Sequence, residues 1–167
     1  MKRNALVSRV YLGLGTRSWF LALTRIPTVA LDKLLLRRSE GRVAIGDLLG
    51  ASSLLLTTTG RRSGQPSNTP LFYFPHDSGY VVVASNFGRP NHPGWSFNLL
   101  ADPRATVAVD GRTVPVQARL LEGDERSDAW ARVIRFWPGY DAYRARAGRE
   151  LRIFVLEPTG AEPASES

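Results

Sequence analysis

The sequence predicts a mainly antiparallel β protein of the α+β class, arranged as a small barrel with flanking helices. From residue 53 onward, short runs of β-branched, aromatic and aliphatic residues are separated by clusters of glycine, proline, asparagine and aspartate, as in strands and turns. Two intervening segments carry apolar residues at helical spacing. With 43% hydrophobic and 22% charged residues, the chain of 167 residues can build the core of one ordinary domain.

Six strands are expected, each bounded by turn residues. Asp110-Gly111 is a favoured hairpin dipeptide, and it separates the fourth strand from the fifth. Pro158 ends the last strand. The expected strands are 54–59, 71–74, 80–84, 105–110, 112–121 and 151–156.

One or two helices are expected between the strands. A short helix over 93–100 begins with proline in its first turn. A second helix over 124–136 has apolar residues at helical spacing. The expected organisation is a basic amphipathic helical segment (1–50), a barrel domain (51–158) and a disordered tail (159–167).

The net charge lies in the N-terminal segment. Residues 1–42 hold nine lysines and arginines but two acidic residues, so they account for the whole net charge of +7. This argues against a uniform nucleic-acid-binding face. Arginines interrupt each apolar run before the roughly 20 residues of a spanning helix, and a secretory signal matches poorly. We therefore expect a cytoplasmic protein whose N-terminal helices either lie on the anionic inner membrane surface or cover the barrel.

Residue types restrict the chemistry further. The chain has no cysteine and two histidines, His76 and His92, which excludes thiolate chemistry and argues against a metal site. Each histidine lies in a separate turn and is expected at the surface. Motifs for a phosphate-binding P-loop, a zinc protease or a serine nucleophile elbow are absent from the sequence. Hydroxyls, carboxylates, arginines or a bound cofactor must supply the chemistry.

The turn from Gly60 to Gly64 is the first candidate site. It places Arg61, Arg62 and Ser63 between two glycines, which suits an anionic ligand. The alternative is a hairpin turn with solvated arginines.

Two other segments are candidates. Residues 84–93 lead into the helix bearing Trp95 and Asn98, and backbone amides at such a helix start hold phosphate, although Trp95 could simply anchor the helix. Trp137, Tyr140 and Tyr143 surround an expected helix break. Such rings form either a wall for a flat apolar ligand or a satellite core.

In their order and spacing, several separated motifs resemble the deazaflavin-dependent nitroreductase family of actinobacteria. They are LLTTTGRRSGQP at 55–66, TPL at 69–71, VAS at 83–85, NHPGWSFNL at 91–99 and PGY at 138–140. The resemblance covers about residues 53–157. It implies a split β-barrel related to FMN-binding oxidoreductases, the coenzyme F420 (8-hydroxy-5-deazaflavin) as cofactor, and hydride transfer to a quinone, nitroaromatic or similar activated acceptor.

The resemblance also implies the site residues. Ser85 and Tyr140 would be catalytic, by donating a hydrogen bond to the acceptor oxygen as negative charge develops there. Phe72, Trp137 and Tyr143 would bind the acceptor. The coenzyme would be bound by Arg61, Arg62, Ser63, Ser67, Asn68, Thr69, Pro70, Leu71, Val83, Ala84, Ser85, Asn86, Gly94, Trp95, Ser96, Phe97, Asn98 and Tyr140.

Four positions depart from the family pattern. Ser67 and Asn86 stand where the family often has basic residues, and Phe72 and Trp137 stand in place of tyrosines. Arg89 is a candidate to replace the lost positive charge. Three alternatives remain: an F420-binding protein without turnover, an FMN-dependent oxidoreductase on the same barrel, and a basic membrane or nucleic-acid adaptor.

Overall fold

The computed structural model describes residues 52–77 and 79–160. The expected helical segment over 1–50, and the expected tail beyond residue 160, lie outside these ranges. Within them, every helix is too short or too polar to cross a bilayer.

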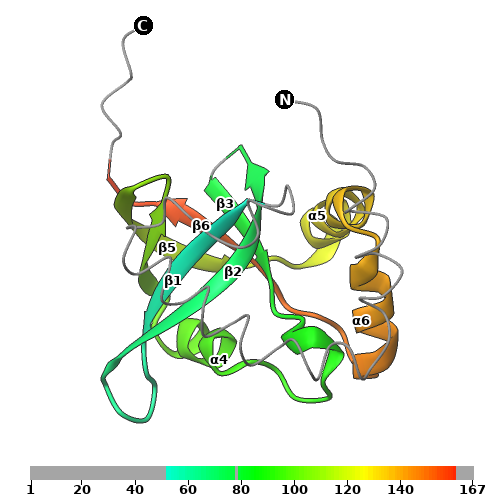
Figure 1. Cartoon of the computed structure of the whole chain (residues 1–167), viewed down its shortest axis with the longest axis horizontal. Coiled ribbons are helices and arrows are strands. Elements are labelled where there is room, and N and C mark those ends of the chain that lie inside the picture. Colours follow the sequence, from blue (N-terminus) through cyan, green and yellow to red (C-terminus); the bar gives the residue numbers. More distant parts are fainter. Residues whose placement is uncertain (1–51, 78, 161–167) are drawn as a thin grey trace, which may run out of the picture.

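Six antiparallel strands form a closed barrel (Figure 1). The order around the barrel is β1-β2-β3-β6-β5-β4, so neighbours in sequence are mostly neighbours in space. The strands are β1 (Ser53–Thr59), β2 (Pro66–His76), β3 (Gly79–Val83), β4 (Arg104–Val109), β5 (Arg112–Leu120) and β6 (Ile153–Pro158). The predicted class, an α+β protein built on a small antiparallel barrel, is confirmed.

The barrel interior holds one hydrophobic core. Leu54 and Leu56 of β1 point inward and are fully buried with Phe154 of β6. Helix α4 (Gly94–Ala101) lies across one end of the barrel, where the Trp95 ring is 5.8 Å from the Phe154 ring. Burial of the large Trp95 ring fixes α4 to the barrel.

A second core lies outside the barrel. Helices α5 (Gly123–Phe136) and α6 (Gly139–Ala147) cover the outer faces of β3 and β6, where Val81 and Val155 pair across the two strands. These strands are buried on both faces, which explains their continuous apolar sequences.

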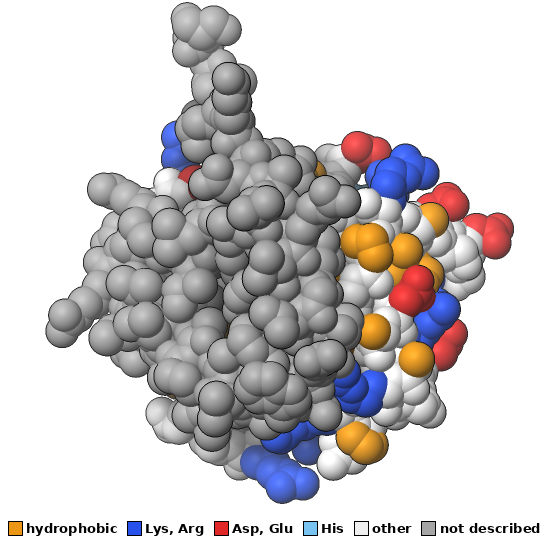
Figure 2. Space-filling model, turned by 45° about the vertical axis from the view of Figure 1, so that its right-hand side comes forward, with side chains coloured by type: hydrophobic (Ala, Val, Ile, Leu, Met, Phe, Trp, Pro, Cys, Tyr) orange, Lys and Arg blue, Asp and Glu red, His pale blue; other side chains and the backbone are white. Residues whose placement is uncertain are grey.

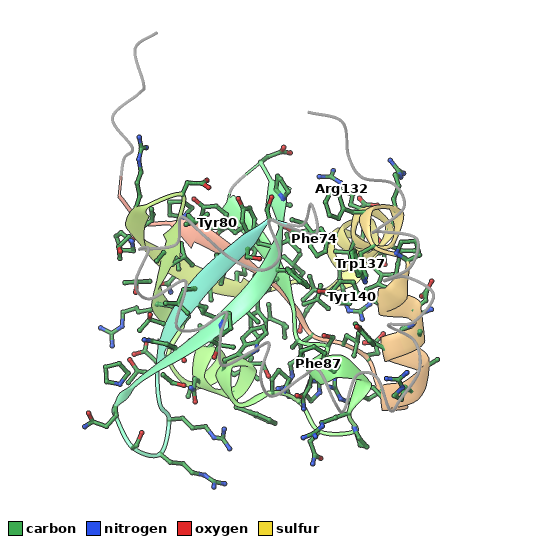
Figure 3. The ribbon with its side chains drawn as sticks, viewed as in Figure 1. Phe74, Tyr80, Phe87, Arg132, Trp137 and Tyr140 are labelled. Carbon is green, nitrogen blue, oxygen red and sulfur yellow. The ribbon has the colours of Figure 1, made fainter. Side chains whose placement is uncertain are left out.

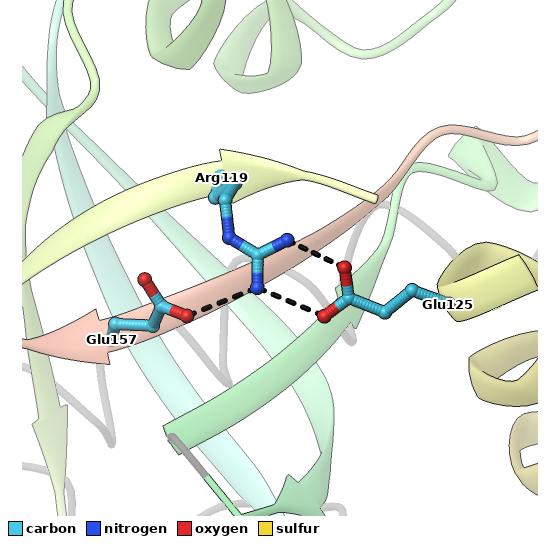
Figure 4. A network of polar contacts seen from close by, with 3 residues as sticks. All are labelled: Arg119, Glu125 and Glu157. Atoms are coloured by element: carbon cyan, nitrogen blue, oxygen red, sulfur yellow. Dashed lines mark hydrogen bonds and ion pairs between the residues drawn. The ribbon is translucent and has the colours of Figure 1, made fainter. Parts of the chain in front are cut away.

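An exposed ion-pair network joins the start of α5 to the barrel (Figure 4). Arg119 of β5 donates to both carboxylate oxygens of Glu125, at 2.6 and 2.9 Å, and to Glu157 of β6 at 3.1 Å. Acidic, basic and small apolar areas also mix on the described surface in Figure 2. This matches a net charge near zero beyond residue 42. Exposed pairs of this kind contribute at most about 1 kcal/mol to stability.

Strand β2 has two halves with different neighbours. Residues 66–72 pair with β1, whereas residues 73–76 pair with β3. In the described part of the chain, no strand pairs with the other edge of residues 66–72. The barrel is therefore split along this half of β2, and alternate backbone N–H and C=O groups point into the split.

Most elements match their predicted positions, with four differences. Strand β6 begins at Ile153 rather than residue 151, and a short 3-10 helix, η1 (Asn86–Gly88), follows β3. Strand β2 begins at Pro66 rather than residue 71, because residues 66–70 continue the ladder with β1. Helix α6 was not predicted: the segment after Trp137 is a helix and not simply a break. Gly148 ends α6 with a φ of +60°, as a helix C-cap often does.

Candidate active site

The turn between β1 and β2 is fixed beside α4. Two glycines shape this turn: Gly60 N–H donates to the carbonyl of Gln65 at 2.8 Å, and Gly64 has a φ of +66°. Asn98 of α4 is buried; its Oδ1 accepts from Arg61 N–H at 3.2 Å and its Nδ2 donates to Thr58 Oγ1 at 3.0 Å. Asn98 thus brings two of the sequence motifs together.

Two arginines share one aromatic ring on α4. The Cζ atom of Arg61 lies 4.7 Å from the centre of the Phe97 ring, and that of Arg152 lies 4.6 Å from it. Arg152 Nη1 also donates to Ser96 Oγ at 3.4 Å, and Ser96 Oγ donates to the Pro93 carbonyl at 2.9 Å. Arg152 was not among the predicted site residues.

Arg149 holds the loop that follows β3. Its guanidinium donates to four backbone carbonyls of this loop, those of Pro90 (2.8 Å), Asn91 (3.1 Å), Arg89 (3.3 Å) and Ala84 (3.4 Å). Asn86 and Phe87 have φ values of 48° and 55°, which is left-handed backbone that costs about 1 kcal/mol or more per residue. Bonds from Arg149 therefore stabilise a strained loop. We call Arg61, Arg149 and Arg152, which lie around α4 and this loop, the arginine cluster.

His92 is part of this arrangement, so its predicted surface position is wrong. The residue is half-buried, and its Nδ1 lies 2.9 Å from Arg149 Nη1. Because the guanidinium can only donate, Nδ1 accepts and the imidazole proton lies on Nε2. Burial, with the charges of Arg149 and Arg152, lowers the pKa of His92 to about 4. His92 is neutral at pH 7.

Aromatic rings gather at the other end of the split. Phe74 of β2 packs edge-on against Phe136 and Tyr140, with ring centroids 5.4 and 5.9 Å apart, and Phe72 lies 6.3 Å from Trp137. Figure 3 shows Phe74, Trp137 and Tyr140 of this group. Phe72, Tyr73, Phe74, Phe136, Trp137 and Tyr140 line a shallow hollow, called the aromatic hollow below.

Tyr140 and Tyr143 of α6 adjoin this hollow in different environments. The Tyr140 ring is 5% exposed, and its burial raises the pKa of the phenol well above its usual range. The Tyr143 ring lies 5.7 Å from it and is only half-buried. Both rings also pack against the second core. The sequence left open whether these rings form a wall for a ligand or a satellite core, and the same residues are placed to do both.

Predicted coenzyme residues of β2 divide between the two faces of the strand. Leu71 pairs with Leu54 and packs against the barrel core, so Asn68, Pro70 and Phe72 lie on the outer face. Asn68 Oδ1 is buried and has no hydrogen-bond partner among the described residues. A buried acceptor without a partner is costly, which marks it as a position for a ligand donor.

Several predicted coenzyme residues have buried side chains. Val83 and Ala84 are at most 5% exposed, and Trp95 is 5% exposed within the barrel core. Their side chains, like that of Leu71, are therefore packing groups. Only their backbone atoms remain for a ligand, and the anchoring alternative for Trp95 is confirmed.

Within the described residues, a split antiparallel barrel has one strand edge without a partner, arginines without an ion pair near one end of it, and aromatic rings at the other. These features fit a barrel oxidoreductase that binds a flat, anionic coenzyme. The family profile described as F420H(2)-dependent quinone reductase matches residues 30–158. The chain belongs to this family and is an oxidoreductase, and coenzyme F420 is the cofactor that membership implies. The narrower nitroreductase label from the motif resemblance is corrected accordingly.

Relatives support the same assignment. The chain is 31% identical over 128 residues to the F420H(2)-dependent quinone reductase Rv1261c of Mycobacterium tuberculosis, covering 72% of this chain and 83% of the relative. A solved F420-H2 dependent reductase, FDR-A, is 36% identical, with a TM-score of 0.58 over 63% of this chain and 93% of its own. A solved chain described as a domain-swapped dimer has the same identity and TM-score, over 63% of this chain and 79% of its own. The split-barrel prediction is confirmed.

The described residues fit such a coenzyme. F420 combines a flat deazaflavin ring, a ribityl chain, and a phosphate that leads to glutamate carboxylates. The open edge of β2 and Asn68 Oδ1 offer hydrogen-bond partners for a ring, whereas Arg61, Arg62 and Arg152 form no ion pair with a described carboxylate and offer donors for anions. Among the described residues, there is no cluster of side chains that could hold a metal ion.

Proposed function

We propose that this protein transfers a hydride from reduced F420 to a quinone, with nitroaromatic and similar activated compounds as further acceptors. The observation that carries the proposal is the group of aromatic rings, Phe72 and Trp137 among them, at the end of the open half of β2. A flat coenzyme along that edge and a flat acceptor packed against these rings would meet face to face, the arrangement that hydride transfer requires.

The coenzyme would follow the split from one end to the other. Its ring would lie along residues 67–71 and 83–86, in contact with Tyr140 at the side of the hollow. Its phosphate and acidic tail would reach Arg61, Arg62 and Ser63 and the start of α4 at residues 94–98. When bound, reduced F420 supplies the hydride.

The acceptor would be held by Phe72, Trp137 and Tyr143, and its developing oxyanion by a hydroxyl. Ser85 is the stronger donor candidate, because it is half-buried and its hydroxyl makes no hydrogen bond within the described residues. Tyr140 is the second candidate; its raised pKa keeps the phenol protonated and able to donate. A hydroxyl at this position stabilises the charge on the acceptor oxygen and passes it a proton from solvent.

Binding and turnover measurements test the proposal against its alternatives. We expect the purified protein to quench or shift F420 fluorescence on titration, and to oxidise reduced F420 in the presence of menadione. Tight binding without menadione-dependent oxidation would identify a binding protein without turnover. A yellow protein that retains FMN and ignores F420 would identify an FMN enzyme.

We further propose that residues 1–42, which hold the whole net charge, bring a cytoplasmic enzyme to the anionic inner membrane surface, where quinones are found. The full-length chain should co-sediment with anionic vesicles at low salt, not with zwitterionic ones, and high salt should release it. A chain that stays in the supernatant with anionic vesicles would contradict membrane contact.

A further inference from the structure

The arginine cluster contains two cations that the sequence motifs did not indicate, Arg149 and Arg152. Arg149 is bonded to the loop carbonyls, whereas Arg152 is not. We infer that Arg152, stacked on Phe97 together with Arg61, is a binding residue for the anionic chain of the coenzyme, its phosphate or the carboxylates beyond. This inference rests on the proposed function for the identity of the ligand.

The backbone holds Arg152 in a fixed place. Its neighbours Leu151 and Ile153 are fully buried, and Arg152 lies immediately before β6. From there the half-buried side chain reaches the first turn of α4, where it contacts Ser96 and Phe97. Arg61 approaches the same ring from the turn between β1 and β2. Phe97 thus contacts two guanidinium groups from distant parts of the sequence.

Their charges lack counter-ions within the described residues. There, the carboxylates in ion pairs are paired with other arginines: Asp102 with Arg104, Glu125 and Glu157 with Arg119, Glu150 with Arg126, and Asp141 with Arg144. Burial is the main cause of the lowered pKa values of His92 and Arg149, and the positive charge of Arg152 lowers both further. Positive charges without counter-ions on one side of α4 are stabilised when an anion binds beside them.

The geometry suits a phosphate or carboxylate. A guanidinium that contacts a ring through its face keeps the N–H donors at its edge free. These donors can form bidentate hydrogen bonds to an anion in the plane of the guanidinium. The pair also explains how this chain binds an acidic coenzyme without basic residues at Ser67 and Asn86. Arg152, immediately before β6, supplies a charge that those two positions lack.

Two ligands separate the role of Arg152 from a general structural role. F420 and the free deazaflavin that ends at the ribityl chain, without phosphate or glutamate, are each titrated by fluorescence into wild-type protein and Arg152→Gln. We expect Arg152→Gln to weaken F420 binding about tenfold, the value of one charge-assisted hydrogen bond, and to leave the truncated deazaflavin within about twofold. Arg152→Lys should recover part of the loss.

Arg144→Gln is the matched control. It also removes a guanidinium stacked on a ring, 5.0 Å from the centre of Trp130, but on the outer side of α6. It should leave the affinity for both ligands unchanged. Unchanged F420 affinity in folded Arg152→Gln would overturn the inference, as would equal losses for the two ligands.

A third measurement keeps failure of the inference distinct from failure of the proposed function. Inorganic phosphate should raise the Tm of the wild-type protein and of Arg144→Gln, but have little effect on Arg152→Gln. If wild-type protein binds neither deazaflavin, the proposed function fails; a phosphate effect lost in Arg152→Gln would then still support an anion site at Arg152. If wild-type protein binds neither deazaflavin and phosphate does not raise its Tm, both the proposed function and the inference about Arg152 are overturned.

Discussion

The arginine cluster and the aromatic hollow occupy the two ends of one split, yet different forces build them. Around the cluster, directional bonds fix each element: Asn98 ties the turn to α4, and Arg149 ties the loop 84–92 through four carbonyls. Around the hollow, rings such as Phe74 and Tyr140 meet at 5.4–6.3 Å through apolar contact. Directional bonds select one ligand shape, whereas ring packing accepts many.

This difference predicts a strict coenzyme and a broad choice of acceptor. Hydrogen-bonding sites reject a ligand that leaves their donors unpaired, but hydrophobic pockets discriminate weakly between flat rings of similar size. Changes at the cluster should therefore alter coenzyme affinity, and changes at the hollow should alter the use of acceptors.

The largest expected effect comes from removing both arginines of the turn. Arg61→Ala with Arg62→Ala should weaken F420 binding about 100-fold, since each charge-assisted bond contributes about 1.5 kcal/mol, and should flatten the salt dependence of binding. The backbone bond from residue 61 to Asn98 remains, so the turn should keep its shape. Fluorescence titration measures the affinity, with the exposed Arg104→Ala as control. Normal affinity in the folded double variant would remove this turn from the site.

The next effect tests whether directional bonds really fix the loop. Arg149→Ala removes every bond from this side chain to the loop carbonyls and should lower the unfolding free energy by about 2 kcal/mol, measured by urea denaturation. F420 affinity should fall as well. Arg149→Lys, which cannot form the same set of bonds, should recover only a small part. An unaltered loop, judged by unchanged hydrogen exchange at 84–92, would contradict this account.

Substitutions in and beside the aromatic hollow should act on the acceptor alone. Trp137→Ala and Tyr143→Ala should raise the KM for a bulky quinone about tenfold, through lost ring contact, while F420 affinity changes little. Steady-state kinetics with menadione and a larger quinone compare the two acceptors. If both variants mainly lost thermal stability and kept their kinetics, these rings would be packing groups.

The smallest expected effect is a pH dependence at the cluster. The pKa of His92 is about 4 in the folded protein against an ordinary 6.5, so the unfolded chain binds a proton first as the pH falls. The contribution of neutral His92 to the free energy of unfolding is fully present above pH 6.5 and is lost as the pH falls from 6.5 to 4. Solvent reaches the half-buried ring, so we expect a loss of about 1 kcal/mol. His92→Gln should flatten this part of the curve; identical curves would contradict it.

Local patterns in the sequence explain what could be predicted. Strands such as β3 and β6 could be predicted because each is a run of consecutive apolar residues bounded by turn residues, and both signals can be seen in a short stretch of sequence. Helix α6 was missed because Pro138 precedes it, Gly139 is its first residue and arginines interrupt it. The helix is held mainly by burial of Tyr140 and Ala147 in the second core.

Distant contacts explain what the sequence could not reveal. Arg149 donates to carbonyls of the loop 84–92, and Arg152 contacts Phe97, both far earlier in the chain. The residues next to these arginines in the sequence form no motif that would indicate such contacts. Conversely, Trp95 and Leu71 lie in motifs that predicted coenzyme binding, but their side chains pack in the barrel core or against it. Motif order thus identified the family and a candidate site, whereas finding which of the motif side chains pack in the core required the strand register.

The open half of β2 also affects how copies of this protein behave toward one another. An unpaired strand edge is a template on which a second chain can add a strand, the first step toward aggregation. Pro66 and Pro70 lie in this half, and each lacks the backbone N–H that such an added strand would need. Proline thereby makes the edge a poor partner for another chain while leaving its carbonyls in place. Within the described residues, the prolines therefore weaken the ability of this open edge to pair with a second chain.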